Sequence, residues 1–457
     1  MSIVFKKKIA SISLLCFKFI TFCTSPTFYS VKIHLKKPLG YAIIVVVLTF
    51  YICRKETTVN TADKRRLGIY LHVPFCASKC AYCDFYSYVP KNDNIYERYA
   101  NALVSHMEHY KSSAAGCAPD SVYIGGGTPT VLPPEHLLKI VRGVRKNFSL
   151  AKNAEFTIEA NPATVDLSLL RRLRWAGVNR ISFGLQSADQ RELKALSRIH
   201  SRSEFEESYY AARRAKIENI SVDLMFGIPH QTTESLLRSI DYVTRLDPEH
   251  ISLYNLKIEP NTQFGRIGAE NLPLPDEDEE FKMYMYACQM LEDRGYKQYE
   301  ISNFAKPGKM SRHNLKYWNC EEYLGLGPSA HSYFNGTRFS FIPSINQYLK
   351  GIENMGSETI ISDGSEQISG RAMMGEYIML RFRLSEGLPL GEFRRRFGYD
   401  FEEMYGEKLL PYIKNGYMVK GRDSIALTPR GMFVSNYILS DILSFSDLNA
   451  ISPAAEF

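Results

Sequence analysis

The chain has 457 residues, of which 45% are apolar and 23% are charged, which is typical of a globular protein and excludes a chain that is disordered throughout. Nine cysteines at this length do not indicate a disulfide-stapled domain; they suit a reducing compartment. The net charge of +7 comes from residues 1–66, which hold twelve Lys/Arg and two Asp/Glu, so the remainder carries −3 and gives no reason to expect nucleic acid as a partner.

Residues 1–66 form a basic and hydrophobic N-terminal extension. Its apolar run YAIIVVVLTFYIC, at 41–53, is shorter than the ~20 residues that cross a bilayer as a helix. No A-x-A cleavage site follows the run. Three interpretations stay open: a short membrane anchor, a signal peptide, or a translated upstream segment that is not part of the working protein.

From Leu67 onward, six β-rich runs alternate with helical patterns. The predicted strands are 67–73, 121–126, 154–161, 179–186, 219–227 and 250–258, and the predicted helices are 94–110, 133–146, 166–176, 188–196, 203–216 and 232–245. Such alternation predicts parallel strands joined by right-handed crossovers. Six units are too few to close an eight-stranded barrel. We therefore predict an α/β fold, an incomplete (β/α)6 TIM-like barrel over 67–290, with a doubly wound sheet as the alternative.

The pattern changes after Pro260. The run LPLPDEDEE, at 272–280, predicts an acidic connector before a helix at 281–294. Residues 299–336 are rich in glycine, aromatic and polar residues and are more typical of a binding loop than of a core element. Residues 366–457 predict a mostly helical, winged-helix-like C-terminal domain with a hairpin at 418–432, which leaves 291–365 as a separate region.

Polar and glycine residues gather where the predicted strands end. His72 to Cys83 follow the first strand and Gly125 to Thr130 the second, while Glu159, Gln186 and Asp223 end the third, fourth and fifth. Function in α/β barrels gathers at the C-terminal ends of strands. We therefore predict the functional site at this end of the barrel.

The loop HVPFCASKCAYCDFYSYV, at 72–89, spaces three cysteines as C-x3-C-x2-C. Three thiolates, from Cys76, Cys80 and Cys83, can hold three irons of a [4Fe–4S] cluster and leave the fourth iron open. A zinc site is the alternative, and it would need a fourth ligand such as Asp84 or His72.

With Tyr82 before the third cysteine, this loop resembles the signature of the radical S-adenosylmethionine superfamily. The resemblance implies that the open iron binds S-adenosylmethionine and that the cluster cleaves it to a 5'-deoxyadenosyl radical. The turn GGGTP, at 125–129, is similar to the next part of that pattern, in which glycines let the backbone approach the methionyl group.

Further segments narrow the resemblance. YIGGGTPT, TIEANP, RISFGLQS, VDLMFGIP and RHNLKYWNCEEYLGLGPSAHS, together with the cysteine loop, resemble the oxygen-independent coproporphyrinogen III oxidase-like family over residues 66 to 440. The resemblance implies that nine residues contact S-adenosylmethionine: Tyr70, Tyr82, Gly126, Gly127, Thr128, Glu159, Gln186, Arg198 and Asp223.

Phe85 separates two branches of this family. The oxidase branch reads C-x3-C-x2-C-x-C, and Phe85 stands in place of the fourth cysteine. The chain instead resembles the branch of HemW-type haem chaperones, which lacks the decarboxylase activity. The motif HNLKYW then implies haem contacts by His313, Asn314, Tyr317 and Trp318. The alternative for these residues is a buried aromatic cluster around a hydrogen-bonded histidine.

The sequence thus predicts a haem chaperone that holds a [4Fe–4S] cluster, S-adenosylmethionine and haem, with a coproporphyrinogen III oxidase as the alternative. Its expected partners are haem, haem-requiring apoproteins and an electron donor for the cluster, and a homodimer stays open. We expect a cytoplasmic protein, associated with the membrane if the N-terminal extension is an anchor.

Overall fold

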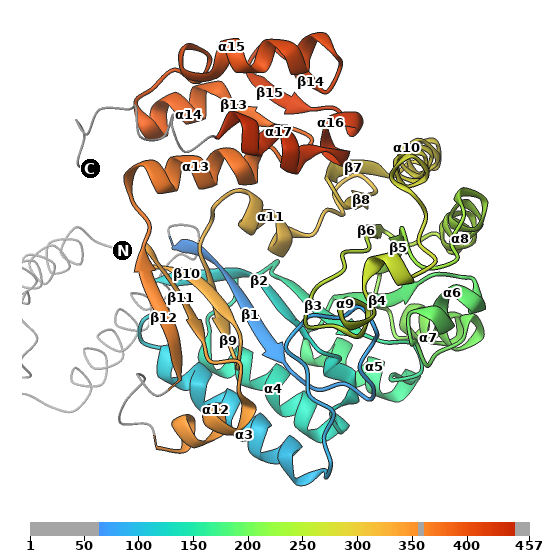
Figure 1. The fold of residues 1–457 in the computed structure, drawn as a ribbon. Helices are drawn as coiled ribbons and strands as arrows, with labels where there is room; N and C mark the ends of the chain where they lie inside the picture. Colours follow the sequence, from blue (N-terminus) through green and yellow to red (C-terminus); the bar gives the residue numbers. More distant parts are fainter. Residues whose placement is uncertain (1–63, 355–360, 444–457) are drawn as a thin grey trace, which may run out of the picture. The chain divides into compact units, whose positions relative to one another are not determined.

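The computed structural model describes residues 64–354 and 361–443, and these described residues group into one compact unit (Figure 1). The predicted N-terminal extension lies, up to residue 63, outside the described residues. Within the described ranges, no helix is both long and apolar enough to cross a membrane.

Six neighbouring parallel strands form the centre of a curved sheet. They are β1 (Arg65–Val73), β2 (Cys117–Gly126), β3 (Glu155–Ala160), β4 (Arg180–Gln186), β5 (Asn219–Phe226) and β6 (His250–Asn255). Strand β1 alternates as a barrel strand must: Leu67, Ile69 and Leu71 are fully buried on one face, and Tyr70 and His72 point to the other. The predicted incomplete α/β barrel is confirmed.

Helices cover the outside of these strands (Figure 1). They are α3 (Asn94–Tyr110), α4 (Pro134–Asn147), α5 (Leu167–Ala176), α6 (Gln190–Ala195), α7 (Arg202–Arg214) and α8 (Thr233–Leu246). Local caps set several of their ends. The Asp166 carboxylate accepts from the Leu169 N–H at the start of α5, and Gly177, with φ +110°, ends that helix. Ser201 and Glu204 form a capping box on α7.

The sheet is wider than the six predicted strands. Its order is β12-β11-β10-β9-β1-β2-β3-β4-β5-β6-β8-β7. The added strands are β7 (Lys297–Glu300), β8 (Asn303–Ala305), β9 (Tyr323–Leu326), β10 (His331–Phe334), β11 (Thr337–Phe341) and β12 (Ser362–Gln367). The prediction of a binding loop at 299–336 is wrong for β9, because this strand pairs in parallel with β1 and buries Leu324 and Leu326 completely.

The acidic run after the barrel was also assigned wrongly. Helix α10 (Glu277–Asp293) begins inside the predicted connector, because the Asp276 side chain accepts from the Glu279 N–H and caps it. Acidic side chains in the first turn also interact favourably with the helix dipole. Two short helices flank strands β7 to β11 along the chain, α9 (Gln263–Ile267) before them and α12 (Ile345–Glu353) after them.

The C-terminal region is mostly helical, as predicted. A three-stranded antiparallel sheet of β13 (Leu388–Pro389), β14 (Met418–Lys420) and β15 (Ser424–Leu427) stands among α13 (Gly370–Arg381), α14 (Leu390–Phe397), α15 (Phe401–Lys414), α16 (Pro429–Phe433) and α17 (Ser435–Ile442). Strands β14 and β15 form the predicted hairpin. A helix, a short strand, two helices and a hairpin follow one another in the order of a winged helix.

A buried carboxylate joins two of the barrel helices. Glu192 on α6 is fully buried, accepts the Ser187 hydroxyl at 2.6 Å and the Gln231 amide at 3.2 Å, and also accepts the Ser235 hydroxyl at the start of α8. Leu196 follows α6 as its C-cap residue, and its carbonyl accepts the Ala81 N–H of the cysteine loop at 3.2 Å. Glu192 therefore holds a helix end against which that loop rests.

Replacing Glu192 by alanine should lower the free energy of unfolding by about 3 kcal/mol, because buried hydroxyl and amide donors would lose their charged acceptor. Urea unfolding followed by circular dichroism measures this change. The exposed Glu207→Ala on α7 serves as the control and should stay within about 0.5 kcal/mol of the unchanged protein. Equal unfolding midpoints for both variants would contradict the assignment.

Candidate functional site

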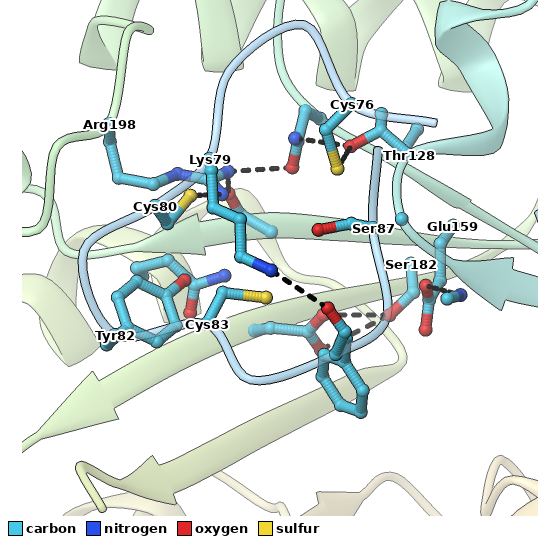
Figure 2. A pocket seen from close by; sticks show the side chains of 18 of the residues that line it. Cys76, Lys79, Cys80, Tyr82, Cys83, Ser87, Thr128, Glu159, Ser182 and Arg198 are labelled. Carbon is cyan, nitrogen blue, oxygen red and sulfur yellow. Dashed lines mark hydrogen bonds between the residues drawn. The ribbon is translucent and has the colours of Figure 1, made fainter. Parts of the chain in front are cut away.

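A cavity of about 340 Å³ opens at the C-terminal end of the parallel strands (Figure 2). It collects eleven of the predicted site residues: Cys76, Cys80, Tyr82, Cys83, Gly126, Gly127, Thr128, Glu159, Gln186, Arg198 and Asp223. These residues are spread over more than 140 positions of the chain, and the barrel brings them to one place. The fold therefore brings these residues together at one end of the barrel, and their role as a functional site stays a prediction.

The cysteine loop that forms one wall is closed at its base and tied at its tip. At the base, the Tyr88 N–H donates to the Pro74 carbonyl at 2.6 Å, and the Cys76 N–H donates to the Tyr88 carbonyl at 3.1 Å. At the tip, the Ala81 carbonyl accepts the Phe264 N–H at 2.9 Å. The three thiols are thus carried on a loop with fixed ends.

The thiols lie in different surroundings. The Cys80 sulfur accepts from Arg198 Nη1 at 3.4 Å, and the Cys76 sulfur lies 3.9 Å from the Thr128 hydroxyl (Figure 2). Burial raises the pKa of Cys76, and it raises the pKa of Cys83 to about 11. Both thiols therefore keep their protons at neutral pH until a metal centre replaces them.

The donor set fits a cluster better than a single ion. In the ranges 64–354 and 361–443, no three His, Cys, Asp or Glu side chains converge closely enough to hold one metal ion. A closed zinc site needs four converging ligands. A [4Fe–4S] cluster instead takes one thiolate at each of three corners, so its ligands stand further apart. The free thiols of Cys76, Cys80 and Cys83 around one cavity match that requirement.

The glycines at the end of β2 lie so close to neighbouring atoms that no side chain would fit there. A Cβ atom on Gly127 would lie 2.6 Å from the Phe75 carbonyl oxygen, and one on Gly126, whose φ is +107°, would lie 2.6 Å from the His72 ring. One on Gly125 would lie 2.7 Å from the Glu159 carboxylate. The Gly127 N–H itself is bonded to the Val73 carbonyl at 2.8 Å. These glycines therefore let the turn pack directly against the cysteine loop.

Two carboxylates and a guanidinium line the deeper part of the cavity. Glu159 accepts the Tyr123 hydroxyl at 2.7 Å and the Gly126 N–H at 3.1 Å. Asp223 accepts the Ser182 hydroxyl at 3.2 Å. Burial raises the pKa of both carboxyls, that of Glu159 to about 7. The sequence analysis placed Asp223 at the end of the fifth strand. In the structure it lies in the middle of β5.

Arg198 links this polar part of the cavity lining to the cysteine loop. Its Nη2 donates to Asn161 Oδ1 at 2.7 Å, while its buried Nε has no hydrogen-bond partner among the described residues. An unpartnered buried donor beside a cavity can bind a carboxylate ligand. With the glycine turn and the two carboxylates, it offers groups suited to the amino acid and ribose parts of S-adenosylmethionine.

Tyr70 lies outside this lining. Its hydroxyl is 3.0 Å from His72 Nδ1, and its ring packs against those of Tyr123 and His313, with centroid distances of 6.3 and 6.4 Å. The structure therefore places Tyr70 behind the cavity wall.

The predicted haem motif lies on α11 (Arg312–Trp318), and the fold places its residues in different surroundings. His313 is buried, with Nδ1 3.0 Å from the Ser121 hydroxyl and Nε2 2.9 Å from the Tyr317 hydroxyl, and burial lowers its pKa to about 3. This is the aromatic cluster with a hydrogen-bonded histidine that the sequence left as the alternative. Tyr317 and Trp318 instead line a second cavity, and Asn314 lines neither.

Three residues of the site were missed from the sequence. Asn161 bridges Arg198 and the Thr128 hydroxyl, to which it donates at 2.8 Å, and Tyr123 supports Glu159. Arg180 is 2% exposed at the start of β4, and its charge acts on both Glu159 and Asp223. Two features of the sequence could have indicated these residues. Arg180 is a lone arginine at the start of an apolar strand, and Tyr123 lies two positions before Gly125 and so on the same face of its strand.

Glu159 should make stability depend on pH in the cluster-free protein. The folded-state pKa of about 7 lies above the usual value of 4.5, so the folded state binds this proton more tightly than the unfolded state. The contribution of Glu159 to the free energy of unfolding is fully present below pH 4.5 and is lost as the pH rises to 7. Because glutamine has no carboxyl group to ionise, Glu159→Gln should gain about 2 kcal/mol relative to the unchanged protein between pH 5 and pH 8.

Urea unfolding of both proteins across this pH range checks the prediction, with Glu207→Gln as the control. Parallel curves for the unchanged protein and Glu159→Gln would contradict it.

Known proteins match both the barrel and the C-terminal region of this chain. Residues 70–243 match the radical SAM superfamily, and residues 368–434 match the HemN C-terminal domain. Coproporphyrinogen III oxidase (HemN) from Escherichia coli is similar in structure, with a TM-score of 0.74 and 22% identity over 84% of this chain and 91% of that chain. At this identity the likeness shows the fold.

Relatives named heme chaperone HemW are matched by this chain over nearly their whole length. The protein from Bacillus subtilis is 34% identical over 376 residues, which cover 82% of this chain and 98% of that relative. The protein from Escherichia coli K12 is 34% identical over 379 residues, which cover 83% and 98%. The chain belongs to the radical SAM superfamily and, within it, to the family of the HemW heme chaperones.

Proposed function

We propose that the protein binds haem and passes it to haem-requiring apoproteins, and that it holds a [4Fe–4S] cluster and S-adenosylmethionine in the first cavity. The observation that carries the proposal is the 34% identity to heme chaperone HemW proteins over 98% of their length. Phe85, 69% exposed at the edge of the cavity, supports it, since the oxidase branch has a cysteine at that place.

Cys76, Cys80 and Cys83 would hold the cluster, whose chemistry is to supply one electron to the bound sulfonium. Arg198 can bind a carboxylate through its free Nε, and Asn161 fixes the orientation of that guanidinium. Glu159 and Asp223 can accept hydrogen bonds from an amino group or from ribose hydroxyls. Their buried negative charge also favours a cationic ligand.

For haem, the motif on α11 supplies rings at the surface of a cavity. Tyr317 and Trp318 give flat apolar area with polar edges, which suits a porphyrin. Iron ligation by His313 would require the bond between its Nε2 and the Tyr317 hydroxyl to open. Asn314 has its N–H bonded to the Ser311 hydroxyl at the start of the helix, which fixes the first turn of the motif.

An oxidase that decarboxylates coproporphyrinogen III is the second candidate. It is favoured by the structural likeness to HemN and by a cofactor cavity with a complete set of polar groups. Phe85 and the end-to-end similarity to the chaperones favour haem transfer.

Substituting all three loop cysteines by serine should abolish the broad visible absorption of the cluster after anaerobic reconstitution with iron and sulfide, because serine provides no thiolate. The control is Cys288→Ala, a buried cysteine outside the cavity, which should retain the spectrum. A cubane spectrum that survives the triple substitution would contradict the assignment.

One anaerobic preparation separates the two candidate functions. Titration with haem, followed by its Soret band, should saturate near one haem per chain, while carbon dioxide release from coproporphyrinogen III should stay at the level of the triple cysteine variant. Release at a catalytic rate would establish the oxidase and refute the chaperone. Absence of a saturable haem spectrum would also refute it.

A further inference from the structure

Three neighbouring helices on the outside of the barrel carry basic residues toward their C-terminal ends. Helix α5 lies between α4 and α7 and contacts both of them (Figure 1). Two exposed cations stand in or just after the last two turns of each helix, and together they are Arg142, Lys146, Arg171, Arg172, Arg214 and Lys216. We refer to these six residues as the basic face.

Two further arginines bind the three helix ends to one another. Arg145 Nε at the end of α4 donates to the Ala176 carbonyl of α5 at 2.9 Å. Arg174 Nε on α5 donates to the Lys216 carbonyl just beyond α7 at 2.9 Å. Such bonds satisfy carbonyls that have no partner within their own helix. The helices therefore hold the basic face in a fixed arrangement.

The six cations of the basic face have no acidic partner within the described part of the chain. No described carboxylate lies within ion-pair distance of them, and none of their side chains donates a hydrogen bond to a described residue. This holds for Glu207 and Glu218, the exposed carboxylates nearest to Arg214 and Lys216 in the sequence. The helix dipole favours a cation in the last turn. It does not account for two on each of three adjacent helices, because these like charges repel one another.

Two exposed aromatic rings accompany the cations. Trp175 is 89% exposed and lies one helical turn after Arg171 on α5, and Tyr210 is 48% exposed and lies one turn before Arg214 on α7. Tryptophan is usually well buried, and Trp175 is one of two in the chain. Trp, Tyr and Arg are the residue types that contribute most to binding energy at protein interfaces. Their combination here indicates a contact surface for another protein.

The charge of the rest of the chain favours an acidic partner at this surface. Residues 67–457 carry a net charge of −3 with the six cations included, so the remainder of that part is more acidic still. An acidic protein is therefore attracted to the basic face and repelled elsewhere, which directs its approach. Two exposed rings make a small apolar area. This suits a partner that binds and leaves, because permanent interfaces are larger and more hydrophobic.

The basic face also lies at the end of the barrel where α11 is held. Helices in α/β units run opposite to the strands, so their C-terminal ends lie at the far end of the barrel from the first cavity. At that end, Arg312 Nη1 of α11 donates to the Asn153 carbonyl, between α4 and β3, at 2.7 Å. A protein bound to the basic face would thus be close to the segment that carries the haem motif.

We propose that the basic face, with Trp175 and Tyr210, is the docking surface for an acidic surface of the apoprotein that receives haem. The proposal rests on the proposed haem-transfer function and adds where the acceptor binds and which charge it presents. Attraction between opposite charges speeds the encounter, and salt screens that attraction. Contacts of the two rings are not screened.

Haem transfer between intact proteins tests this docking surface. The full-length, cluster-loaded protein carrying haem is mixed with excess apocytochrome b5 as the acidic acceptor, and stopped-flow absorption in the Soret region follows haem uptake at low and at high salt. Excess apomyoglobin, which collects released haem, gives the rate of passive release. At low salt, transfer to the acidic acceptor should exceed passive release by about tenfold or more, and high salt should reduce this advantage.

Reversing one charge on each helix should remove the advantage. The variant Lys146→Glu/Arg171→Glu/Arg214→Glu keeps the Arg145 and Arg174 hydrogen bonds and should slow transfer at low salt by about tenfold, with unchanged haem affinity. Trp175→Ala should slow transfer at both salt concentrations.

A matched control changes the net charge equally at other places. Lys350→Glu/Lys414→Glu/Arg422→Glu replaces three exposed cations that have no described carboxylate within ion-pair distance, and it should transfer haem like the unchanged protein. A general effect of net charge would slow both triple variants alike and would overturn the proposal.

The outcomes separate this proposal from the proposed function. If the unchanged protein passes haem to neither acceptor faster than passive release, the haem-transfer function fails. If it does so and the basic-face variant matches the control, the function stands and the docking surface is overturned. Loss of binding to phosphatidylglycerol vesicles or to single-stranded RNA in the basic-face variant, with transfer unchanged, would assign the surface to another partner and also overturn the proposal.

Discussion

The structure depends on how the cysteine loop is held. Three thiols on a free loop would not stay at the corners of one cluster, since each backbone dihedral would add freedom. Here the Pro74–Tyr88 and Cys76–Tyr88 hydrogen bonds close the base, and Ala81 is tied to Leu196 and Phe264. Ala81 thereby links the loop after β1 to segments that follow α6 and β6. The cavity exists because these distant segments support one another.

The cavity also buries carboxylates whose negative charge the neighbouring arginines offset only in part. Glu159 and Asp223 are buried carboxylates, and two arginines, Arg180 beneath them and Arg198 beside the cysteines, oppose their charge. Burying charges costs more than a distant opposite charge returns, which is why the pKa of both carboxyls is raised. A bound cation with donor groups would supply what the carboxylates lack. A positively charged ligand that also carries a carboxylate for Arg198 would match the charges of this cavity.

The sequence predicted local features well and long-range ones poorly. Short stretches of chain determine the alternation of strands and helices, helix caps such as Ser201 with Glu204, and the polar groups at strand ends. The parallel pairing of β9 with β1 joins Tyr323 to Gly68, and no local pattern encodes a contact over that separation. The start of α10 was lost because the acidic run containing Asp276 also reads as a solvated connector. The role of His313 as a haem ligand stays a prediction, whereas its burial depends on β1, β2 and α11 coming together, which no local pattern encodes.

His313 shows why a loss of haem after its substitution would not identify an iron ligand. Its ring lies between Tyr123, at 5.4 Å, and Tyr317, at 5.3 Å between centroids, and both of its nitrogens have partners. Removing the ring would leave two hydroxyls unpaired and a void beside Tyr317, so the wall of the second cavity would shift. Haem affinity would fall whether or not the imidazole had ever touched iron. Only the chemical identity of the axial atom distinguishes a ligand from a group that supports the pocket, so the haem spectrum, and not the loss of affinity alone, has to decide the role of His313.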